Sequence, residues 1–358
     1  MSSKFFKDEK SLNFFKMIAP GTPLREGLEN VLRAKTGALI VIGDSQKILD
    51  TVDGGFNIDC NFSPANLYEL AKMDGAIILN YNVSKILYAN TQLNPSPSIT
   101  TDETGTRHRT AQRVAIETDE IVISISQRRN IITLYKGYDK YVLKDTTRIL
   151  SNGNQAIQTL DKYRKTLDQN MINLTALEFE DLVTLEDVAK VIQRTEMVMK
   201  IANKVERAIL ELGEEGQLVS MQLDELVVNV KQDSKLVFKD YCKNLDMKYN
   251  DFKKLIMQLG SEELLNLTNI IKILGYSSLE EDIEKAISTR GFRILKKIPK
   301  LPYNVIENLI YYFDSFKDIM NATTEDLEEV EGIGNVRAKS IINGIERLKD
   351  QVFLDRHI

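Results

Sequence analysis

The stretch GTRHRTAQRVAIETDEIVISIS, residues 105–126, carries the pattern that decides the fold class. Residues 111–118 fit a helix, and the apolar, β-branched run at residues 121–126 is typical of a buried strand. Similar runs rich in Ile, Val and Leu occur at residues 38–42, 76–79 and 131–135, and Gly, Asn or Asp bounds most of them. Helices that alternate with such strands predict an α/β domain with a central mixed sheet.

Two further helix starts support this interpretation. Thr22-Pro23 and Ser63-Pro64 each place a hydroxyl residue, which can cap a helix, before a proline at the first helical position. The helix after Ser63 would bury one face, because its apolar residues are spaced by three and four.

The strand pattern fades beyond about residue 145. Residues 160–174 carry apolar side chains at helical spacing, residues 182–212 continue in the same style, and GEEG at 213–216 interrupts them. Residues 223–230 fit either a short extended segment or a buried helix. After about residue 290 the predicted helices are shorter, with turns at Pro299–Pro302 and at residues 332–334. We therefore predict an α+β multidomain chain: an α/β domain at 1–145, an all-helical spine at 146–290, and a small helical domain at 291–358.

Composition excludes several classes of protein. The chain has 358 residues and a formal net charge of -5, so it does not hold nucleic acid by bulk positive charge. Two distant cysteines, Cys60 and Cys242, and two histidines rule out a disulfide framework and a zinc cluster. A bound metal would therefore sit on carboxylates and phosphates, which favours Mg²⁺ or Mn²⁺. No apolar run approaches the roughly 20 residues that span a bilayer, so we predict a cytoplasmic protein without a membrane partner.

The densest polar cluster is residues 105–110, GTRHRT, at the predicted N-terminus of a helix. Free backbone N–H groups and the helix dipole favour an anion there, and Arg107, His108 and Arg109 add charged donors. A solvated helix start is the alternative, but three donors and two threonines converge. The cluster predicts a binding site for a phosphate or a triphosphate.

Two smaller motifs are less specific. Asp74 is predicted to end the helix that begins at Pro64, and Gly75 to lead into the strand at 76–79, where a carboxylate can bind Mg²⁺ or accept a proton from a hydroxyl. Taken alone, the motif fits an ordinary turn better. Ser126 and Arg129 fit a second phosphate contact, a subunit contact or a polar hairpin tip.

The last region contains Gly332-Ile333-Gly334 between two predicted helices. A dinucleotide-binding loop is excluded, because the turn follows a helix and lacks the third glycine. The spacing predicts a tight helix–turn–helix in which exposed amides, Arg337 and Lys339 grip a DNA phosphate without reading base sequence. A plain turn between helices is the alternative.

Together these motifs resemble a known family. Asp74-Gly75-Ala76 and Arg107-His108-Arg109 look like the signature motifs of diadenylate cyclases, and the Gly332-Ile333-Gly334 turn resembles the helix-hairpin-helix motif of DNA repair proteins. Their combination, with a helical middle region, resembles the bacterial DNA integrity scanning family over essentially the whole chain. The resemblance implies a nucleotidyltransferase that condenses two ATP into cyclic di-AMP and two pyrophosphates with Mg²⁺ or Mn²⁺. It also implies a homo-octamer that binds branched or junction DNA and is associated with the nucleoid.

The resemblance further implies a role for individual residues. Asp74 would bind the metal and activate the 3′-hydroxyl, and Gly75 would line the nucleotide. Leu93, expected in the loop before Pro95, would contact adenine through its backbone. The phosphate ligands would be Thr106, Arg107, His108, Arg109 and Thr110, assisted by Ser126 and Arg129. Gly332, Gly334, Arg337 and Lys339 would contact DNA, whereas the turn near Pro299 lacks the glycine pair.

Two alternatives remain at this point. One is a DNA-junction binding protein whose nucleotide site only senses ATP, although Asp74 and His108 favour the cyclase. The other is an adenylating ligase, which would need a nucleophilic lysine in a ligase-like motif. None lies near the phosphate cluster.

Overall fold

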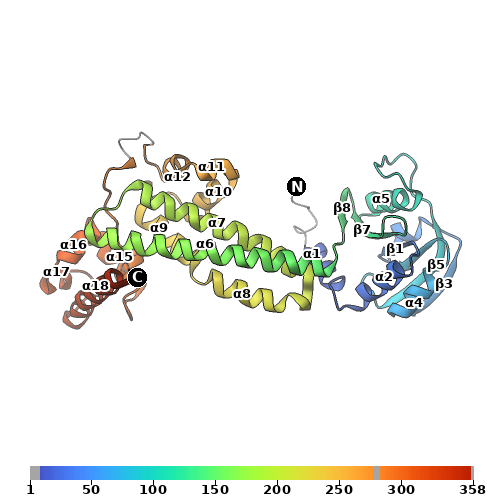
Figure 1. Cartoon of the computed structure of the whole chain (residues 1–358), viewed down its shortest axis with the longest axis horizontal. Helices are drawn as coiled ribbons and strands as arrows, with labels where there is room; N and C mark the ends of the chain where they lie inside the picture. Colours follow the sequence, from blue (N-terminus) through green and yellow to red (C-terminus); the bar gives the residue numbers. More distant parts are fainter. Residues whose placement is uncertain (1–8, 278–282, 356–358) are drawn as a thin grey trace. The chain divides into compact units, whose positions relative to one another are not determined.

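A computed structural model describes residues 9–277 and 283–355 of the chain. Its contacts divide the chain into two compact units, one made of Met1–Asn154 and Glu206–Ser220 and the other of Gln155–Val205 and Met221–Ile358. The α+β class is confirmed, because a mixed sheet occupies the first part of the chain and helices the rest (Figure 1). The three domain boundaries stay a prediction.

The first unit contains all named strands. They are β1 (Ala38–Ile42), β2 (Val52–Asp53), β3 (Phe56–Asn61), β4 (Ala76–Leu79), β5 (Lys85–Leu93), β6 (Ile121–Ser126), β7 (Ile131–Lys136) and β8 (Asp139–Val142). Their order in the sheet is β2-β5-β4-β1-β6-β7-β8, with β3 paired to β5. β1 and β4 are parallel and the other pairs are antiparallel, so the predicted mixed sheet is confirmed.

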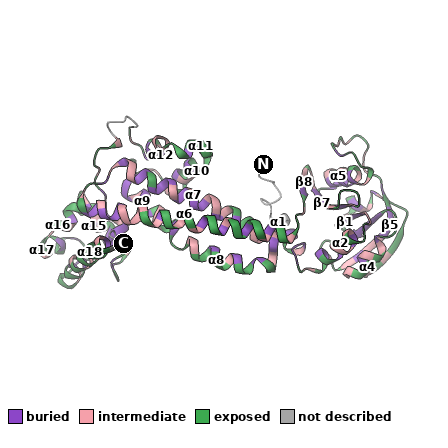
Figure 2. Ribbon diagram, in the orientation of Figure 1, coloured by how far each residue is buried: buried purple, intermediate pink, exposed green. Residues whose placement is uncertain are grey.

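Helices cover both faces of this sheet. The helices of this part are α1 (Glu9–Met17), α2 (Pro23–Arg33), α3 (Gln46–Leu49), α4 (Pro64–Leu70) and α5 (Thr106–Thr118). Side chains of α2 and α4 pack on the face that carries Ile40, whereas α5 packs on the face that carries Leu39 and Val41 (Figures 1 and 2). The predicted caps are confirmed, because the hydroxyls of Thr22 and Ser63 accept hydrogen bonds from backbone amides in the first turns of α2 and α4.

Long helices dominate the middle of the chain. They are α6 (Thr146–Glu180), α7 (Leu185–Leu212), the 3-10 turn η2 (Gly213–Gly216), α8 (Gln217–Val227), α9 (Val230–Tyr241), α10 (Tyr249–Gln258), α11 (Ser261–Leu265) and α12 (Leu267–Ile273). The predicted long helix through residues 160–174 is confirmed as part of α6. Residues 223–230 are helical, apart from a short break between α8 and α9. None of the described helices is long and apolar enough to cross a membrane.

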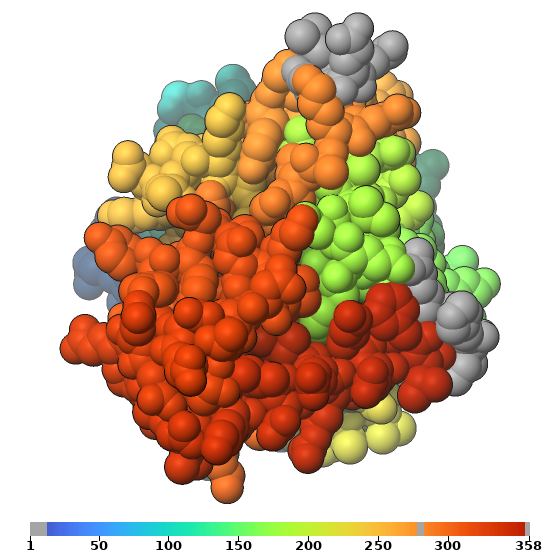
Figure 3. All heavy atoms as spheres, turned by 90° about the vertical axis from the view of Figure 1, so that its left-hand side faces the viewer, coloured from blue at the N-terminus to red at the C-terminus, as the bar shows by residue number. Residues whose placement is uncertain are grey.

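The C-terminal helices share a core with the end of α6. They are α14 (Phe292–Leu295), α15 (Tyr303–Tyr312), α16 (Phe316–Asn321), α17 (Thr324–Glu328) and α18 (Asn335–Asp355). Ala176 and Phe179 of α6 pack into the same apolar cluster as Phe316 and Ile341. In Figure 3, red C-terminal residues lie beside green residues of the long helices at the surface. The C-terminal helices therefore share their apolar core with the end of α6.

Candidate functional site

The N-terminus of α5 faces a pocket of about 750 Å³ at one end of the sheet. Its walls are the first turn of α5 with the preceding loop, and the end of β6 with the turn to β7. The lining residues are Thr104, Gly105, Thr106, Arg107, His108, Ile125, Ser126, Gln127, Arg128 and Arg129. Gly105 caps α5 without a side chain, which leaves the backbone amides of the first turn open to an anion. The pocket therefore combines helix amides with three arginines.

Strand register brings Asp74 and Gly75 to the same end of the sheet. Leu39 of β1 pairs with Ala76 at the start of β4, and Ala38 pairs with Ile125 at the end of β6. Asp74 precedes β4 and Ser126 ends β6, so β1 alone separates their strands. The topology therefore places the exposed Asp74 carboxylate and the pocket along one edge of the domain.

Arg107 lies over the start of β1, next to Gly37. A Cβ atom built on Gly37 would come within 2.0 Å of the Arg107 Nη1 atom and 3.2 Å of the Ile125 carbonyl oxygen. Only glycine leaves room for the guanidinium in this position. No described carboxylate forms an ion pair with Arg107, which leaves its charge available to a ligand.

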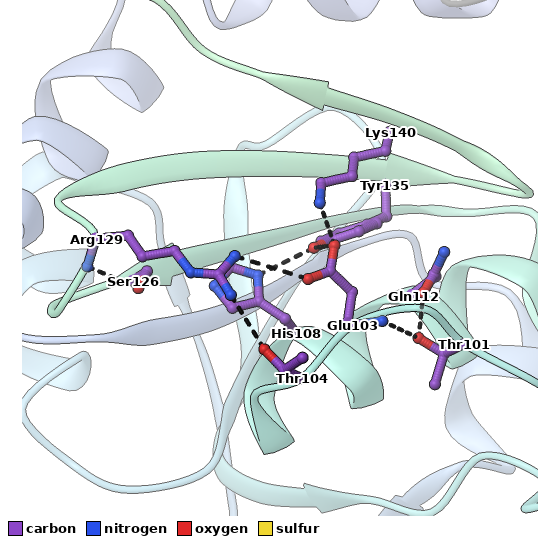
Figure 4. A network of polar contacts seen from close by, with 9 residues as sticks. All are labelled: Thr101, Glu103, Thr104, His108, Gln112, Ser126, Arg129, Tyr135 and Lys140. Carbon is purple, nitrogen blue, oxygen red and sulfur yellow. Dashed lines mark hydrogen bonds and ion pairs between the residues drawn. The ribbon is translucent and has the colours of Figure 1, made fainter.

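His108 lies on the inner side of α5 and belongs to a chain of polar contacts (Figure 4). Its Nδ1 atom is 3.0 Å from the hydroxyl of Tyr135 on β7, and that hydroxyl donates a 2.9 Å hydrogen bond to Oε1 of Glu103. Lys140 of β8 donates to the same carboxylate oxygen. The His108 Nε2 atom is buried and has no hydrogen-bond partner among the described residues.

The charges of this chain follow from its surroundings. Burial raises the pKa of the Glu103 carboxyl, but hydrogen bonds from Lys140 and Tyr135 outweigh burial and hold its pKa below the ordinary value. Burial lowers the pKa of the His108 imidazole. Glu103 opposes this lowering, whereas Arg129, Lys140 and Arg107 add to it. Glu103 is therefore ionised and His108 neutral near pH 7.

Arg129 closes the pocket opposite α5. Its guanidinium donates to the Thr104 hydroxyl at 3.2 Å and lies 3.9 Å from Glu103, while its backbone amide donates to the Ser126 hydroxyl at 3.2 Å. Ser126 and Arg129 are at the β6–β7 hairpin, so the predicted hairpin position is confirmed. The same residues line the pocket, so their position at a hairpin is compatible with binding a ligand.

The structure places some of the predicted phosphate-binding residues together in the pocket and others outside it. Thr106, Arg107 and His108 line the pocket with Ser126 and Arg129, whereas Arg109 and Thr110 lie on α5 outside its lining. Their assigned roles stay predictions.

Two sequence expectations about local structure are wrong. α4 ends at Leu70, and Asp74 lies in the following bend, because Ala71 already caps the helix. Leu93 is not in a loop. It is the buried last residue of β5, where it pairs with Val52. Gly75 has a structural reason for being glycine: its φ is +95°, and a Cβ would approach the backbone of Asn90 and Thr91 to 2.8 Å.

The described residues offer few side chains that could bind a metal ion together. Within the described residues, no group of three His, Cys, Asp or Glu side chains can hold a metal ion. Asp74 is a single exposed carboxylate. It fits a hard divalent cation whose other ligands are water and phosphate oxygens, a common arrangement for Mg²⁺. It does not fit a metal held by protein ligands alone.

The C-terminal turns form a second candidate site. Residues 329–334 connect α17 and α18, which confirms the predicted turn between helices, and Gly332 has a φ of +88°. Gly334 at the end of this turn and the first turns of α18 line a hollow of about 560 Å³ together with residues 298–301, which precede α15. Arg337 donates to the Gly332 carbonyl oxygen, so its side chain braces the turn, whereas Lys339 is exposed.

The first turn has the same backbone geometry although it lacks glycines. The amide of Leu301 donates to Ile298, and that of Ile306 donates to Pro302. The matching bonds of the second turn run from Ile333 to Val330 and from Ala338 to Gly334. Lys300 has a φ of +61° at the position that corresponds to Gly332. The chain therefore has two similar turns side by side.

Sequence reasoning missed several residues that contact the lining of the pocket. Gly37 precedes a strand and belongs to no motif, and Glu103 and Tyr135 lie outside the GTRHRT cluster. The signal for Tyr135 was weak: one hydroxyl at the end of the largely apolar run 131–135. Only the packing of α5 on β7 brings it to His108.

Comparisons with known proteins agree with this geometry. A family model described as "DisA bacterial checkpoint controller nucleotide-binding" matches residues 25–139, and one described as "DisA bacterial checkpoint controller linker region" matches residues 143–283. The DNA integrity scanning protein DisA of Clostridioides difficile is 56% identical over 355 residues, which are 99% of each chain.

Two other comparisons cover different ranges. The protein of the same name from Acetivibrio thermocellus is 54% identical over 98% of this chain and 97% of its own. A crystal structure of DacA from Staphylococcus aureus is 24% identical and covers 39% of this chain and 90% of that one, with a TM-score of 0.29.

Proposed function

This chain belongs to the DisA family of bacterial DNA integrity scanning proteins and is a diadenylate cyclase, and we propose that it condenses two ATP into cyclic di-AMP and two pyrophosphates under the influence of bound branched DNA. The pocket at the N-terminus of α5 supports the substrate. Its helix amides, Arg107 and Arg129 offer donors to a triphosphate, the group that most needs charge neutralisation in phosphoryl transfer.

Asp74 completes the proposed reaction centre. Each ribose 3′-hydroxyl must lose a proton as it attacks the α-phosphate of the other nucleotide, and an exposed carboxylate at this sheet edge can accept that proton. Mg²⁺ or Mn²⁺, when bound to Asp74 and phosphate oxygens, would add neutralising charge. The remaining assignments are Gly75 and the Leu93 backbone at the nucleotide, and Thr106, Arg109, Thr110 and Ser126 at the phosphates.

Ring closure requires two nucleotides in opposite orientation. One pocket holds one triphosphate, and the attacking hydroxyl of each ATP must reach the other nucleotide. Two subunits must therefore present facing pockets, and the proposed assembly is a homo-octamer, as the family resemblance implies.

The two C-terminal turns support DNA as a partner. Both present backbone at one hollow, and the Gly334 amide is exposed beside Lys300 and Arg337. Amides at a helix start bind a phosphate of any sequence, so the turns fit recognition of DNA shape, such as a junction or branch. Gly332 shapes the second turn, and Lys339 adds an exposed charge. A DNA-bound enzyme would be found with the nucleoid.

An activity assay tests the whole proposal. ATP is incubated with the full-length protein and Mg²⁺ or Mn²⁺, with and without a four-way DNA junction, and the products are separated by chromatography. We expect cyclic di-AMP and pyrophosphate, and a rate that changes when the junction is added. Binding of ATP and junction DNA without any cyclic product would instead support a protein that only senses ATP.

Replacing Arg107 by alanine should weaken ATP binding about 10- to 100-fold. A charge-assisted hydrogen bond contributes about 1.5–3 kcal/mol, and Arg107 has no carboxylate partner in the described pocket that would offset its loss. Calorimetric titration with 3′-deoxy-ATP, which lacks the attacking hydroxyl, measures the affinity without turnover.

Gly37→Ala provides the matched variant. Its Cβ would displace the Arg107 guanidinium while every pocket side chain is kept. We expect a similar loss of affinity with an unchanged circular dichroism spectrum. Unchanged affinity in both variants would place the triphosphate elsewhere.

Replacing Gly334 by valine should lower the affinity for junction DNA at least about tenfold while the fold is kept. No atom lies within 4 Å of a Cβ built on Gly334, so the side chain would cover the exposed amide without disturbing the turn. Fluorescence anisotropy with a labelled junction measures the affinity. Asn343→Val, at an exposed position further along α18, serves as the control. Wild-type affinity of Gly334→Val would mean that the turn is only structural.

A further inference from the structure

The hydrogen-bond chain beside the pocket determines which nitrogen of His108 carries a proton. Lys140 and the hydroxyl of Tyr135 both donate to Oε1 of Glu103, so Glu103 is ionised and can only accept. The single hydroxyl proton of Tyr135 is therefore used, and its oxygen can only accept from His108. It follows that His108 carries a proton on Nδ1, which donates to Tyr135 over 3.0 Å (Figure 4).

The other nitrogen of His108 is left without a partner. Nε2 is buried, has no hydrogen-bond partner among the described residues, and belongs to a residue that lines the pocket. In neutral imidazole with a proton on Nδ1, Nε2 carries a lone pair and can only accept. A lone pair repels the oxygens of an ionised phosphate, so neutral His108 opposes the ligand that the surrounding arginines favour.

We propose that binding of a nucleoside triphosphate in this pocket is coupled to the uptake of one proton by Nε2 of His108, and that Tyr135 and Glu103 are positioning residues for this step. The inference rests on the proposed function, since it takes ATP as the ligand. The proton comes from solvent and adds to the Nε2 lone pair. The resulting imidazolium donates from Nδ1 to Tyr135 and from Nε2 to a phosphate oxygen.

The charges that face His108 account for this behaviour. Burial disfavours an imidazolium in the free protein most strongly, and Glu103 opposes this effect. Arg129 of the β6–β7 turn, Lys140 of β8 and Arg107 on the same helix add to the effect of burial. A bound triphosphate would neutralise the arginines. An opposite charge at hydrogen-bond distance favours an ionised neighbour by a factor of about 10 to 1,000, enough to convert neutral His108 to imidazolium near pH 7. Affinity should therefore fall as pH rises, by as much as tenfold per pH unit.

Calorimetric titration of the full-length protein with 3′-deoxy-ATP tests the proposal. At pH 7.5 the phosphates are essentially ionised, because the second phosphate pKa is about 6. Titrations in HEPES and in Tris, which differ in ionisation enthalpy, give the number of protons taken up. We expect more than about half a proton per site for the wild-type protein. Equal binding enthalpies in the two buffers would overturn the proposal.

Two variants separate a proton-linked role from a structural one. His108→Gln offers a permanent neutral donor near the position of Nε2, so it should bind without proton uptake and with an affinity that does not change between pH 6.5 and 8.5. Tyr135→Phe keeps the buried ring but removes the acceptor for Nδ1–H, so both affinity and proton uptake should fall several-fold. Undiminished proton uptake by His108→Gln would also overturn the proposal.

The outcomes distinguish this inference from the proposed function. Binding of 3′-deoxy-ATP without proton uptake contradicts only the coupling at His108. If the wild-type protein binds no 3′-deoxy-ATP at all, the proposal of an ATP site at this pocket fails, and the coupling fails with it.

Discussion

Replacing Asp74 by asparagine should lower the rate of cyclic di-AMP formation by about 100- to 10,000-fold, the range that a positioned proton acceptor contributes. Asparagine keeps the shape of the side chain. It loses the negative charge that accepts the hydroxyl proton, and its neutral amide oxygen binds a hard divalent cation more weakly than a carboxylate does. Product formation is measured by chromatography at saturating ATP, where a change in affinity does not enter.

The fold should tolerate this substitution. Asp74 is exposed in the bend between α4 and β4, and no described residue forms a hydrogen bond or an ion pair with its carboxylate. Affinity for 3′-deoxy-ATP without metal should stay close to that of the wild-type protein, because the triphosphate donors are on α5 and at the β6–β7 hairpin.

A matched control lies at the other end of the sheet. Asp44 is also exposed and follows β1, which runs parallel to β4, so its carboxylate is at the edge opposite Asp74. Asp44→Asn should keep the wild-type rate. Near-normal turnover in a folded Asp74→Asn protein would assign the proton acceptor to another residue.

Sequence patterns were most informative where a segment is buried on both sides. β1, β4, β6 and β7 were predicted because their residues are continuously apolar and nearly all buried. β3 was missed because its side chains are polar or exposed at the edge of the sheet, and the alternating burial of β5 was not recognised. Hydrophobicity identifies strands in the centre of a sheet, whereas strands at its edge depend on backbone pairing, which leaves little pattern.

In the candidate site, too, some residues could be predicted from the sequence and others could not. Arg107 and His108 were found because charged residues cluster at a helix start. Glu103, Tyr135 and Gly37 were not found, since each acts through a contact that exists only after the sheet has formed. A single tyrosine in an apolar strand resembles a core residue. The role proposed for Tyr135 depends on the hydrogen bonds of its hydroxyl, which the sequence does not reveal.

The second large effect concerns a buried ion pair that the sequence did not indicate. Arg293 of α14 is 1% exposed, and its guanidinium forms an ion pair with Glu178 of α6 and donates to the Thr175 hydroxyl at 2.8 Å. Tyr241 donates to the other oxygen of Glu178 at 2.6 Å, and the carboxylate of Asp240 accepts the backbone amides of Phe292 and Arg293. The start of the C-terminal region is thus joined to α6 and α9 by buried polar contacts.

Replacing Arg293 by methionine should destabilise the second unit by about 3–5 kcal/mol, because a buried carboxylate would be left without its counter-charge. Urea unfolding of the full-length protein, followed by helical circular dichroism, measures the shift in midpoint. The double variant Glu178→Met/Arg293→Met should recover much of the loss, since well-packed apolar side chains can replace a buried ion pair at little cost. A destabilisation as large in the double variant as in the single one would show that packing, not charge, dominates here.

The ion pair between Lys317 and Asp181 provides an exposed comparison within the same unit. Solvent screens exposed pairs, so Lys317→Met should leave the midpoint nearly unchanged.

The buried contacts of Arg293 also determine how DNA binding should be tested. Deleting residues 291–358 would remove Arg293 from Glu178 and strip the apolar cluster from Phe179, so lost function in a truncated protein would combine unfolding with loss of the turns. Gly334→Val avoids this problem, because it changes the surface of one turn and leaves the buried contacts between α6 and α14 in place.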